Sequence, residues 1–182
     1  ANGDDLRGNK CRRATQRMTA PITRIAPDVA LLEETGFDSI IDVRSPSEFL
    51  DDHIPGAINL PVLDDVQRAE IGTIFKQINP FEAKRSGAAL VAQNIAGHLQ
   101  TALAKKDRDW RPLIYCWRGG QRSGAMAKIF SDIGWHCAVI EGGYKSYRKA
   151  VLDDLDHLPA KFRLIVLSGP TGTAKTHILR AA

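Results

Sequence analysis

The sequence contains little cysteine and no long apolar run, and both shortages limit what the protein can be. Its three cysteines, Cys11, Cys116 and Cys137, are widely spaced, and no two of them form a CxxC pair. The spacing therefore predicts neither a disulfide framework nor a zinc site, and we expect no bound metal. No apolar segment approaches the roughly 20 residues of a membrane-spanning helix, and the first residues do not resemble a secretory signal. We therefore expect a cytoplasmic protein with reduced thiols.

The sequence also has little net charge outside its first residues. The 182-residue chain has a formal net charge of +4, and residues 1–27 alone hold six basic against two acidic side chains. Basic and acidic residues balance in the rest of the chain, so composition alone does not tell whether the folded protein has a basic surface for nucleic acid. Residues 1–20 lack hydrophobic periodicity, and we expect a disordered basic lead, a solvated tail rather than an RNA-binding arm. Met18 precedes well-patterned sequence and is a candidate start of translation.

From residue 21 onward, short apolar segments alternate with segments of helical periodicity. Strands are expected at 22–25, 39–43, 112–115 and 137–140, with a further short strand that ends at Pro61. Helices are expected at 28–34, from 45, at 64–78, 81–106, 124–133 and 144–155. This alternation predicts an α/β fold, a mainly parallel sheet with helices on both faces. We divide the chain into a lead at 1–20, an α/β domain at 21–156 and a further segment at 161–182.

The sequence around Cys116 is the strongest indication of chemistry. An apolar strand ends at this cysteine, and the residues that follow it are Trp117, Arg118, Gly119, Gly120, Gln121 and Arg122. The glycines let backbone amides turn inward, and Ser123 can cap the next helix. Amides, a helix N-terminus and arginines favour the thiolate and form a cup for an anion. We therefore predict that Cys116 is catalytic and that residues 117–122 bind an anion; a buried structural cysteine is the alternative.

Two flanking runs add a family resemblance. Residues 42–61 and 139–144 resemble the N-terminal and C-terminal signatures of the rhodanese domain, in which Cys116 occupies the position of the persulfide-carrying cysteine. Within that family, the loop after Cys116, the Gly-Gly-Tyr-Lys run at 142–145 and the helical insertion around Phe75 are similar to the tRNA 2-selenouridine synthases.

The resemblance implies a transferase that acts on tRNA. Members of that family replace the sulfur of a wobble 2-thiouridine by selenium from selenophosphate, and they also geranylate that sulfur with geranyl diphosphate. Selenophosphate and geranyl diphosphate are therefore implied as co-substrates, tRNA as a partner, and no tightly bound cofactor or membrane is implied.

Most polar residues of the first signature have a structural role in our interpretation. Asp42, Arg44 and Glu48 are spaced to form a local ion pair and a helix cap. His53 precedes a proline-containing turn, where we expect its ring to be hydrogen-bonded rather than to act as a base. Cys137 lies on an expected strand and is assigned to the core.

The spacing of Cys116 and Arg122 suggests a mechanism. The two residues are related as C-x5-R, the spacing by which tyrosine and dual-specificity phosphatases hold a phosphate over a cysteine. Our hypothesis is that Arg122, Arg118 and the loop amides bind the phosphoryl oxygens of selenophosphate while the Cys116 thiolate takes the selenium as a perselenide. Trp117 is a candidate for stacking on a base or an isoprenoid, or for packing beside the sheet. A stand-alone rhodanese, a C-x5-R phosphatase and an inactive binding module remain alternatives.

A second motif lies near the end of the sequence. It has the form G-x-x-x-x-G-K-[ST] and contains Gly169, Gly172, Lys175 and Thr176. A strand expected at 162–167, this loop and a helix together predict a phosphate-binding P-loop. Ala174 replaces the usual glycine before the lysine, and the sequence ends within two turns of the loop. We therefore expect residues 161–182 to be the first part of a P-loop domain without a working nucleotide site.

Overall fold

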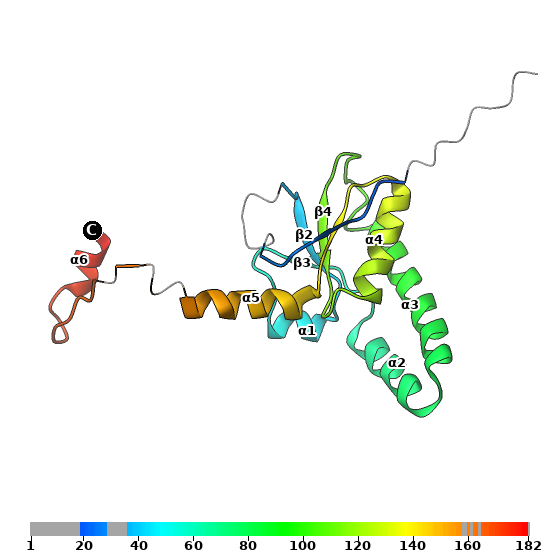
Figure 1. Ribbon diagram of the computed structural model, residues 1–182, viewed down its shortest axis with the longest axis horizontal. Helices are drawn as coiled ribbons and strands as arrows, with labels where there is room; N and C mark the ends of the chain where they lie inside the picture. Colours follow the sequence, from blue (N-terminus) through cyan, green and yellow to red (C-terminus); the bar gives the residue numbers. More distant parts are fainter. Residues whose placement is uncertain (1–18, 29–35, 158–159, 161, 164, 182) are drawn as a thin grey trace, which may run out of the picture. The chain divides into compact units, whose positions relative to one another are not determined.

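A computed structural model describes residues 19–28, 36–157, 160, 162–163 and 165–181. The chain divides into two compact units, residues 1–148 and 149–182. The strands of the first unit form one sheet in the order β1-β5-β4-β2-β3, and all four pairings are parallel (Figure 1). These strands are β1 (Thr23–Ile25), β2 (Ser39–Asp42), β3 (Ile58–Asn59), β4 (Pro112–Tyr115) and β5 (Ala138–Ile140).

Helices occupy most of the connections between the strands. They are α1 (Pro46–Asp51), α2 (Asp65–Gln77), α3 (Pro80–Gln100), α4 (Gln121–Ile133) and α5 (Gly143–His157), followed by α6 (Lys175–Ala181). Among the helices of the described residues, none is both long and apolar enough to cross a membrane. The helix expected at 28–34 lies almost entirely outside the described residues, and the predicted domain limits stay predictions.

Helices cover both faces of the sheet. On one face, Ile114 of β4 belongs to a buried cluster with Ile95 of α3 and Phe130 of α4. On the opposite face, the ring of Tyr115 lies 6.2 Å from that of Tyr144 in α5. Because successive side chains of a strand point to opposite faces, these contacts place α3 and α4 on one side and the start of α5 on the other. The predicted fold class is therefore confirmed.

Capping residues set the limits of the long helical hairpin formed by α2 and α3. The side chain of Asp64 accepts a 2.7 Å hydrogen bond from the amide of Gln67, and that of Asn79 accepts one of 2.8 Å from the amide of Glu82. Pro80 is the first residue of α3. Proline has no amide hydrogen, but an amide at this position would have no acceptor within the helix. The predicted break between the two helices is confirmed, but α3 ends at Gln100 rather than at residue 106, and turns follow it.

The second unit differs from its expected form. Residues 162–163 and 165–167 are not in a strand, although 162–167 were expected to form one. Ile165 and Val166 are each 85% exposed. A β-strand needs a neighbouring strand for its backbone hydrogen bonds, and the described part of 149–182 contains no strand that could pair with this segment.

Candidate active site around Cys116

The segment 116–120, called here the Cys116 loop, connects β4 to α4 at the carboxyl edge of the sheet. Strand β2 lies beside β4, with Asp42 opposite Tyr115. The residues that follow β2 and the thiol that follows β4 therefore meet at one edge, which is where parallel α/β sheets bind their ligands.

The thiol of Cys116 is buried and surrounded by hydrogen-bond donors. Only 3% of the residue is exposed, and its Sγ accepts a 3.3 Å hydrogen bond from the amide of Gly120 and lies 3.3 Å from Oγ of Ser123. Burial raises the pKa of Cys116, but hydrogen bonds from the Ser123 hydroxyl and from the amides of Ser123, Gly120 and Arg118 outweigh it and hold the pKa below its ordinary value. The surroundings therefore favour the thiolate, which is the nucleophilic form.

Ser123 does not cap the helix as the sequence predicted. Helix α4 begins at Gln121, three residues earlier than expected, and Gly120 occupies the N-cap position. Ser123 consequently lies in the first turn, where its hydroxyl is 3.3 Å from both the carbonyl oxygen of Gly120 and the sulfur of Cys116. The hydroxyl interacts with the reactive atom instead of with free helix amides.

The start of α5 holds the back of the Cys116 loop. The amide of Tyr144 donates to the carbonyl of Cys116 at 2.8 Å, and that of Lys145 donates to the carbonyl of Trp117 at 3.0 Å. Gly143 has φ +61°, and a Cβ there would lie 2.1 Å from the Cys116 carbonyl oxygen. Only glycine permits so close a crossing of two backbones. The loop carbonyls are thereby turned toward α5, while loop amides face the sulfur.

Asp42 and Arg44 form the local ion pair that their spacing predicted. Arg44 Nη2 lies 2.6 Å from Asp42 Oδ2, and the two side chains are 1% and 0% exposed. The guanidinium also donates to the carbonyl of Asp52 at 2.6 Å and lies 4.1 Å from the centre of the Tyr144 ring. Removing either charge would leave the other buried and unpaired, so this pair supports the edge of the site structurally.

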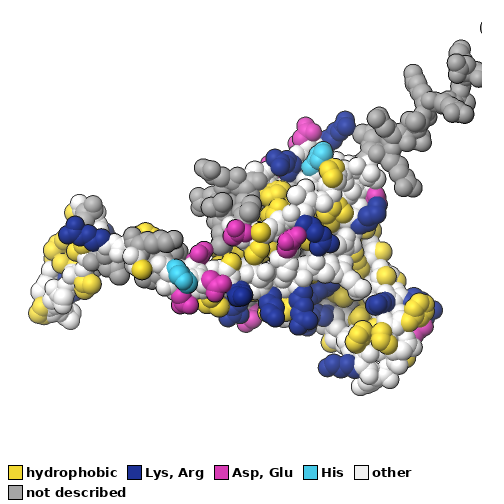
Figure 2. Space-filling model, viewed as in Figure 1, with side chains coloured by type: hydrophobic (Ala, Val, Ile, Leu, Met, Phe, Trp, Pro, Cys, Tyr) yellow, Lys and Arg dark blue, Asp and Glu magenta, His cyan; other side chains and the backbone are white. Residues whose placement is uncertain are grey.

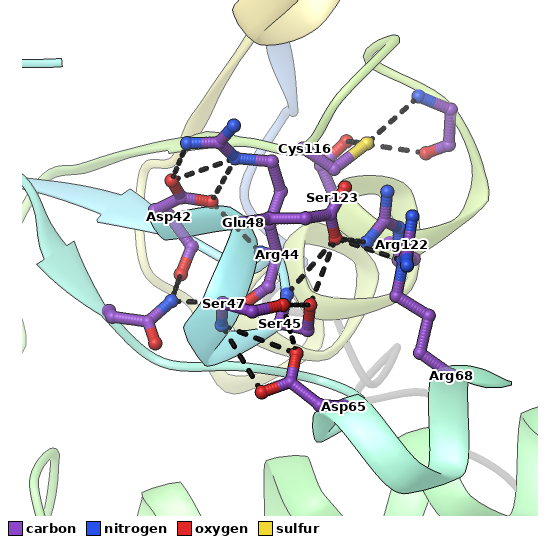
Figure 3. A network of polar contacts seen from close by, with 12 residues as sticks. Asp42, Arg44, Ser45, Ser47, Glu48, Asp65, Arg68, Cys116, Arg122 and Ser123 are labelled. Carbon is purple, nitrogen blue, oxygen red and sulfur yellow. Dashed lines mark hydrogen bonds and ion pairs between the residues drawn. The ribbon is translucent and has the colours of Figure 1, made fainter. Parts of the chain in front are cut away.

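Glu48 joins three helices beside the site (Figure 3). Its Oε2 accepts hydrogen bonds from Arg122 Nη1 at 2.7 Å and from the amide of Ser45 at 3.2 Å, and it pairs with Arg68 Nε at 3.1 Å. Burial raises the pKa of Glu48, but the hydrogen bond and charge of Arg122, with Ser45 and Arg68, lower it overall. The predicted helix-capping role of Glu48 is confirmed, because it forms a capping box with Ser45.

Arg122 is thus paired with a carboxylate in addition to occupying the C-x5-R position. Sequence reasoning missed both this pair and the participation of Arg68. Glu48 and Arg122 are 74 residues apart, and no local pattern connects them. Their only sequence signal was the C-x5-R spacing, which marks Arg122 without its partner.

The other marked residues of the first unit have clear surroundings. His53 Nδ1 lies 2.9 Å from the carbonyl oxygen of Phe49, and its ring stacks on the Phe49 ring at 3.9 Å, so its expected structural role is confirmed. Trp117 is half-buried, with its ring 5.8 Å from that of Tyr144, which bears out a packing role. Cys137 is buried in the core, as expected. Arg118 and Gln121 are exposed at the rim of the loop.

The residues of the P-loop motif belong to the second unit. Nζ of Lys175 hydrogen-bonds to the carbonyl oxygens of Gly169 and Pro170 at 2.7 and 2.6 Å, within its own loop. Ala174 has φ +54°, a left-handed conformation that glycine adopts without strain, so the alanine is unfavourable here. Over the described ranges of both units, no group of three His, Cys, Asp or Glu side chains is arranged to hold a metal ion.

Comparison of the sequence with known proteins identifies similar proteins. The family described as the rhodanese-like domain matches residues 28–150. The chain is 35% identical over 158 residues to the tRNA 2-selenouridine synthase of Nitrosomonas europaea, covering 84% of this chain and 41% of that protein. It is 38% identical over 143 residues to the protein of the same name from Proteus mirabilis, covering 78% and 39%. The chain thus spans about two fifths of the length of these curated relatives.

A solved structure is also similar. It is the crystal structure of the N-terminal domain of a candidate ATP/GTP-binding protein from Clostridium difficile 630, with a TM-score of 0.58 and 37% identity. The match covers 72% of this chain and 99% of that one. The sequence resemblance to tRNA 2-selenouridine synthases is confirmed by the named relatives. With its thiol cupped by amides at the carboxyl edge of a parallel sheet, the chain belongs to the rhodanese-like domain family.

Proposed function

We propose that this protein transfers sulfur or selenium with Cys116 as the nucleophile, during modification of the wobble 2-thiouridine of tRNA. The observation that carries the proposal is the Cys116 thiol, whose pKa is held low by Ser123 and by loop amides at the edge of the sheet. The names of the relatives support tRNA as the acceptor and selenium as the element delivered. A cytoplasmic location, where tRNA meets reduced thiols, goes with this proposal.

Thiosulfate illustrates the transfer of a sulfane sulfur. The Cys116 thiolate attacks the outer sulfur, a new S–S bond forms, the S–S bond of thiosulfate breaks, and sulfite leaves with the electron pair. The terminal sulfur of the resulting persulfide is anionic and faces the donors that held the thiolate. Cyanide then takes this sulfur as thiocyanate and restores the thiolate.

The selenium of selenophosphate differs in oxidation state from the outer sulfur of thiosulfate. This selenium is at the selenide level, so a perselenide on Cys116 with release of phosphate would need an oxidant to remove two electrons. Displacement at phosphorus needs none: the thiolate attacks phosphorus, the P–Se bond breaks, selenide leaves, and water hydrolyses the thiophosphate ester. We therefore propose this route for selenophosphate in place of the perselenide, with Arg122, Arg118 and the loop amides binding the phosphoryl oxygens.

Other activities follow from the sequence, and the phosphatase among them is tested in the same experiment. The C-x5-R spacing favours a phosphatase as the second candidate. Geranylation with geranyl diphosphate stays a prediction from the family resemblance, and no residue of the first unit is assigned to it. The expectation that the P-loop motif does not form a working nucleotide site also stays a prediction.

The test uses thiosulfate, an aryl phosphate and two cysteine variants. Thiosulfate with cyanide should yield thiocyanate, and mass spectrometry should find one added sulfur atom on the Cys116 peptide. Cys116→Ala should lose both, whereas Cys11→Ser, with a thiol outside the described residues, should keep both. Release of phenol from an aryl phosphate without thiocyanate would favour the phosphatase. If neither phenol nor thiocyanate forms, both candidate functions are overturned.

A further inference from the structure

The α2–α3 hairpin and the start of α4 enclose a groove of about 470 Å³. We call it the hairpin groove, and its apolar lining includes Ile71, Phe75, Ala83, Gly87, Val91 and Ala125. Its volume lies in the range of about 300–1,000 Å³ that is typical of ligand sites. The groove is therefore large enough for a ligand of nucleotide size.

Positive charge surrounds this apolar lining. Lys84 and Arg122 line the groove, and Arg68 and Lys76 line a hollow that shares Phe75 and Arg122 with it. Glu48 pairs with both arginines and neutralises one of their charges, so a net positive charge remains with the two lysines. No acidic side chain is among the described residues that line either space. Figure 2 shows hydrophobic and basic side chains gathered over the hairpin, at the lower right. An apolar wall with a cationic rim suits a ligand with a flat apolar part and negative phosphates.

The tip of the hairpin exposes large apolar side chains that the core does not use. Phe75, Ile78 and Phe81 are 53%, 67% and 70% exposed. Exposed apolar patches on small domains commonly mark interaction sites. Phenylalanine rings in particular stack on unpaired bases, which present a flat apolar face.

Arg122 connects the groove with the reactive cysteine. It lines both spaces and lies in the first turn of α4, directly after the Cys116 loop. The groove therefore lies at the end of α4 that follows the Cys116 loop.

We propose that the hairpin groove binds unpaired nucleotides of an RNA loop, with bases against Phe75 and the apolar wall and phosphates beside Lys76 and Lys84. The proposal rests on the proposed function, because the groove holds the RNA acceptor of that same site. A helical RNA without a loop has no unpaired base to insert and is bound more weakly.

Two neighbouring alanines of α3 provide a matched test of the groove. Ala88 and Ala89 are both exposed, but only Ala88 lines the groove. Ala88→Trp fills the space, and binding of a fluorescent tRNA anticodon stem-loop, followed by anisotropy, should weaken about tenfold, the scale of one lost base stack. Ala89→Trp should bind as the wild type does.

Two lysines test the rim. Lys84→Glu should weaken stem-loop binding and flatten its salt dependence, because a phosphate contact is lost. Lys105→Glu makes the same change of charge beyond the other end of α3 and should have little effect. Equal losses in both variants would indicate unspecific attraction and overturn the proposal.

Further outcomes separate the groove from the chemistry. The proposal fails if a blunt RNA duplex binds as tightly as the stem-loop, if Ala88→Trp binds the stem-loop like the wild type, or if light scattering shows that Ala88→Trp breaks a dimer instead. Every variant is also assayed with thiosulfate and cyanide. Thiocyanate formation without groove-dependent RNA binding overturns the groove alone, whereas groove-dependent binding without thiocyanate overturns the proposed transfer and supports the groove.

Discussion

The carboxylate of Glu48 accepts a 2.7 Å hydrogen bond from the guanidinium of Arg122, although 74 residues separate the two in the sequence. Glu48 belongs to α1, which follows β2, and Arg122 to the first turn of α4, which follows β4. The pair thus links two of the helices that begin at the carboxyl edge of the sheet. It also fixes the direction of the arginine that stands at the C-x5-R position.

Glu48→Gln should lower the free energy of unfolding at neutral pH by about 1–2 kcal/mol, because the amide keeps the shape but loses charged hydrogen bonds. The pKa of Glu48 is lowered in the folded protein. Its contribution is therefore complete above the ordinary glutamate pKa and is lost as the pH falls through the folded pKa. Urea unfolding of both proteins at several pH values should show a difference that shrinks on acidification; a difference that grows would contradict this account.

Arg122→Ala should impair the use of selenophosphate far more than the use of thiosulfate. A charged hydrogen bond to a phosphoryl oxygen contributes about 1.5–3 kcal/mol, so a loss of at least about tenfold in kcat/KM is expected for selenophosphate. Initial rates of selenide and thiocyanate formation provide the comparison. Arg85→Ala, on the exposed surface of α3, is the control. Equal losses for both donors would exclude the phosphoryl-binding role.

Ser123→Ala should raise the pKa of Cys116, since the hydroxyl of Ser123 is among the groups that lower it. The rate of alkylation by iodoacetamide, measured against pH in a Cys11→Ser background, reports the thiolate fraction. Its midpoint should move to higher pH in Ser123→Ala. Ser86→Ala, on α3, should leave the midpoint where it is.

Gly143→Ala should destabilise the protein by at least about 2 kcal/mol, because an added Cβ would overlap the carbonyl oxygen of Cys116 in a left-handed backbone conformation. Thiocyanate formation should fall with it, since the Cys116 loop must move. Gly97→Ala offers the opposite result: a Cβ added to this helical glycine would meet no atom within 4 Å, and alanine there should stabilise by about 0.5–1 kcal/mol. Thermal unfolding measures both effects, and the same sign for the two variants would refute the argument.

Local patterns predicted the elements that local chemistry determines. The four apolar residues of β4 and the break between α2 and α3 at Asn79 and Pro80 depend on neighbours in sequence, and both were predicted. The pair of Asp42 and Arg44 was predicted for the same reason, because its members are only two positions apart.

The exact course of the Cys116 loop and the contacts between distant segments were not predictable in the same way. Gly120 rather than Ser123 caps α4, because the loop needs a backbone that turns around the Cys116 sulfur. Residues 162–167 have the composition of a strand, but composition does not supply the neighbour that a strand requires. Glu48, beyond the carboxyl end of one strand, meets Arg122 only after the sheet has brought β2 beside β4.

The hydrogen bond from the amide of Lys145 to the carbonyl of Trp117 has an electronic consequence for the thiol. That carbonyl shares a peptide group with the amide of Arg118, which is among the groups that lower the pKa of Cys116. A peptide group that accepts a hydrogen bond at its carbonyl becomes a stronger donor at its amide, which strengthens the effect of Arg118 on the thiol. The positive N-terminal end of the α5 dipole therefore acts on the sulfur indirectly, through one polarised peptide group. The amides of Tyr144 and Lys145 themselves bond to loop carbonyls and not to the sulfur.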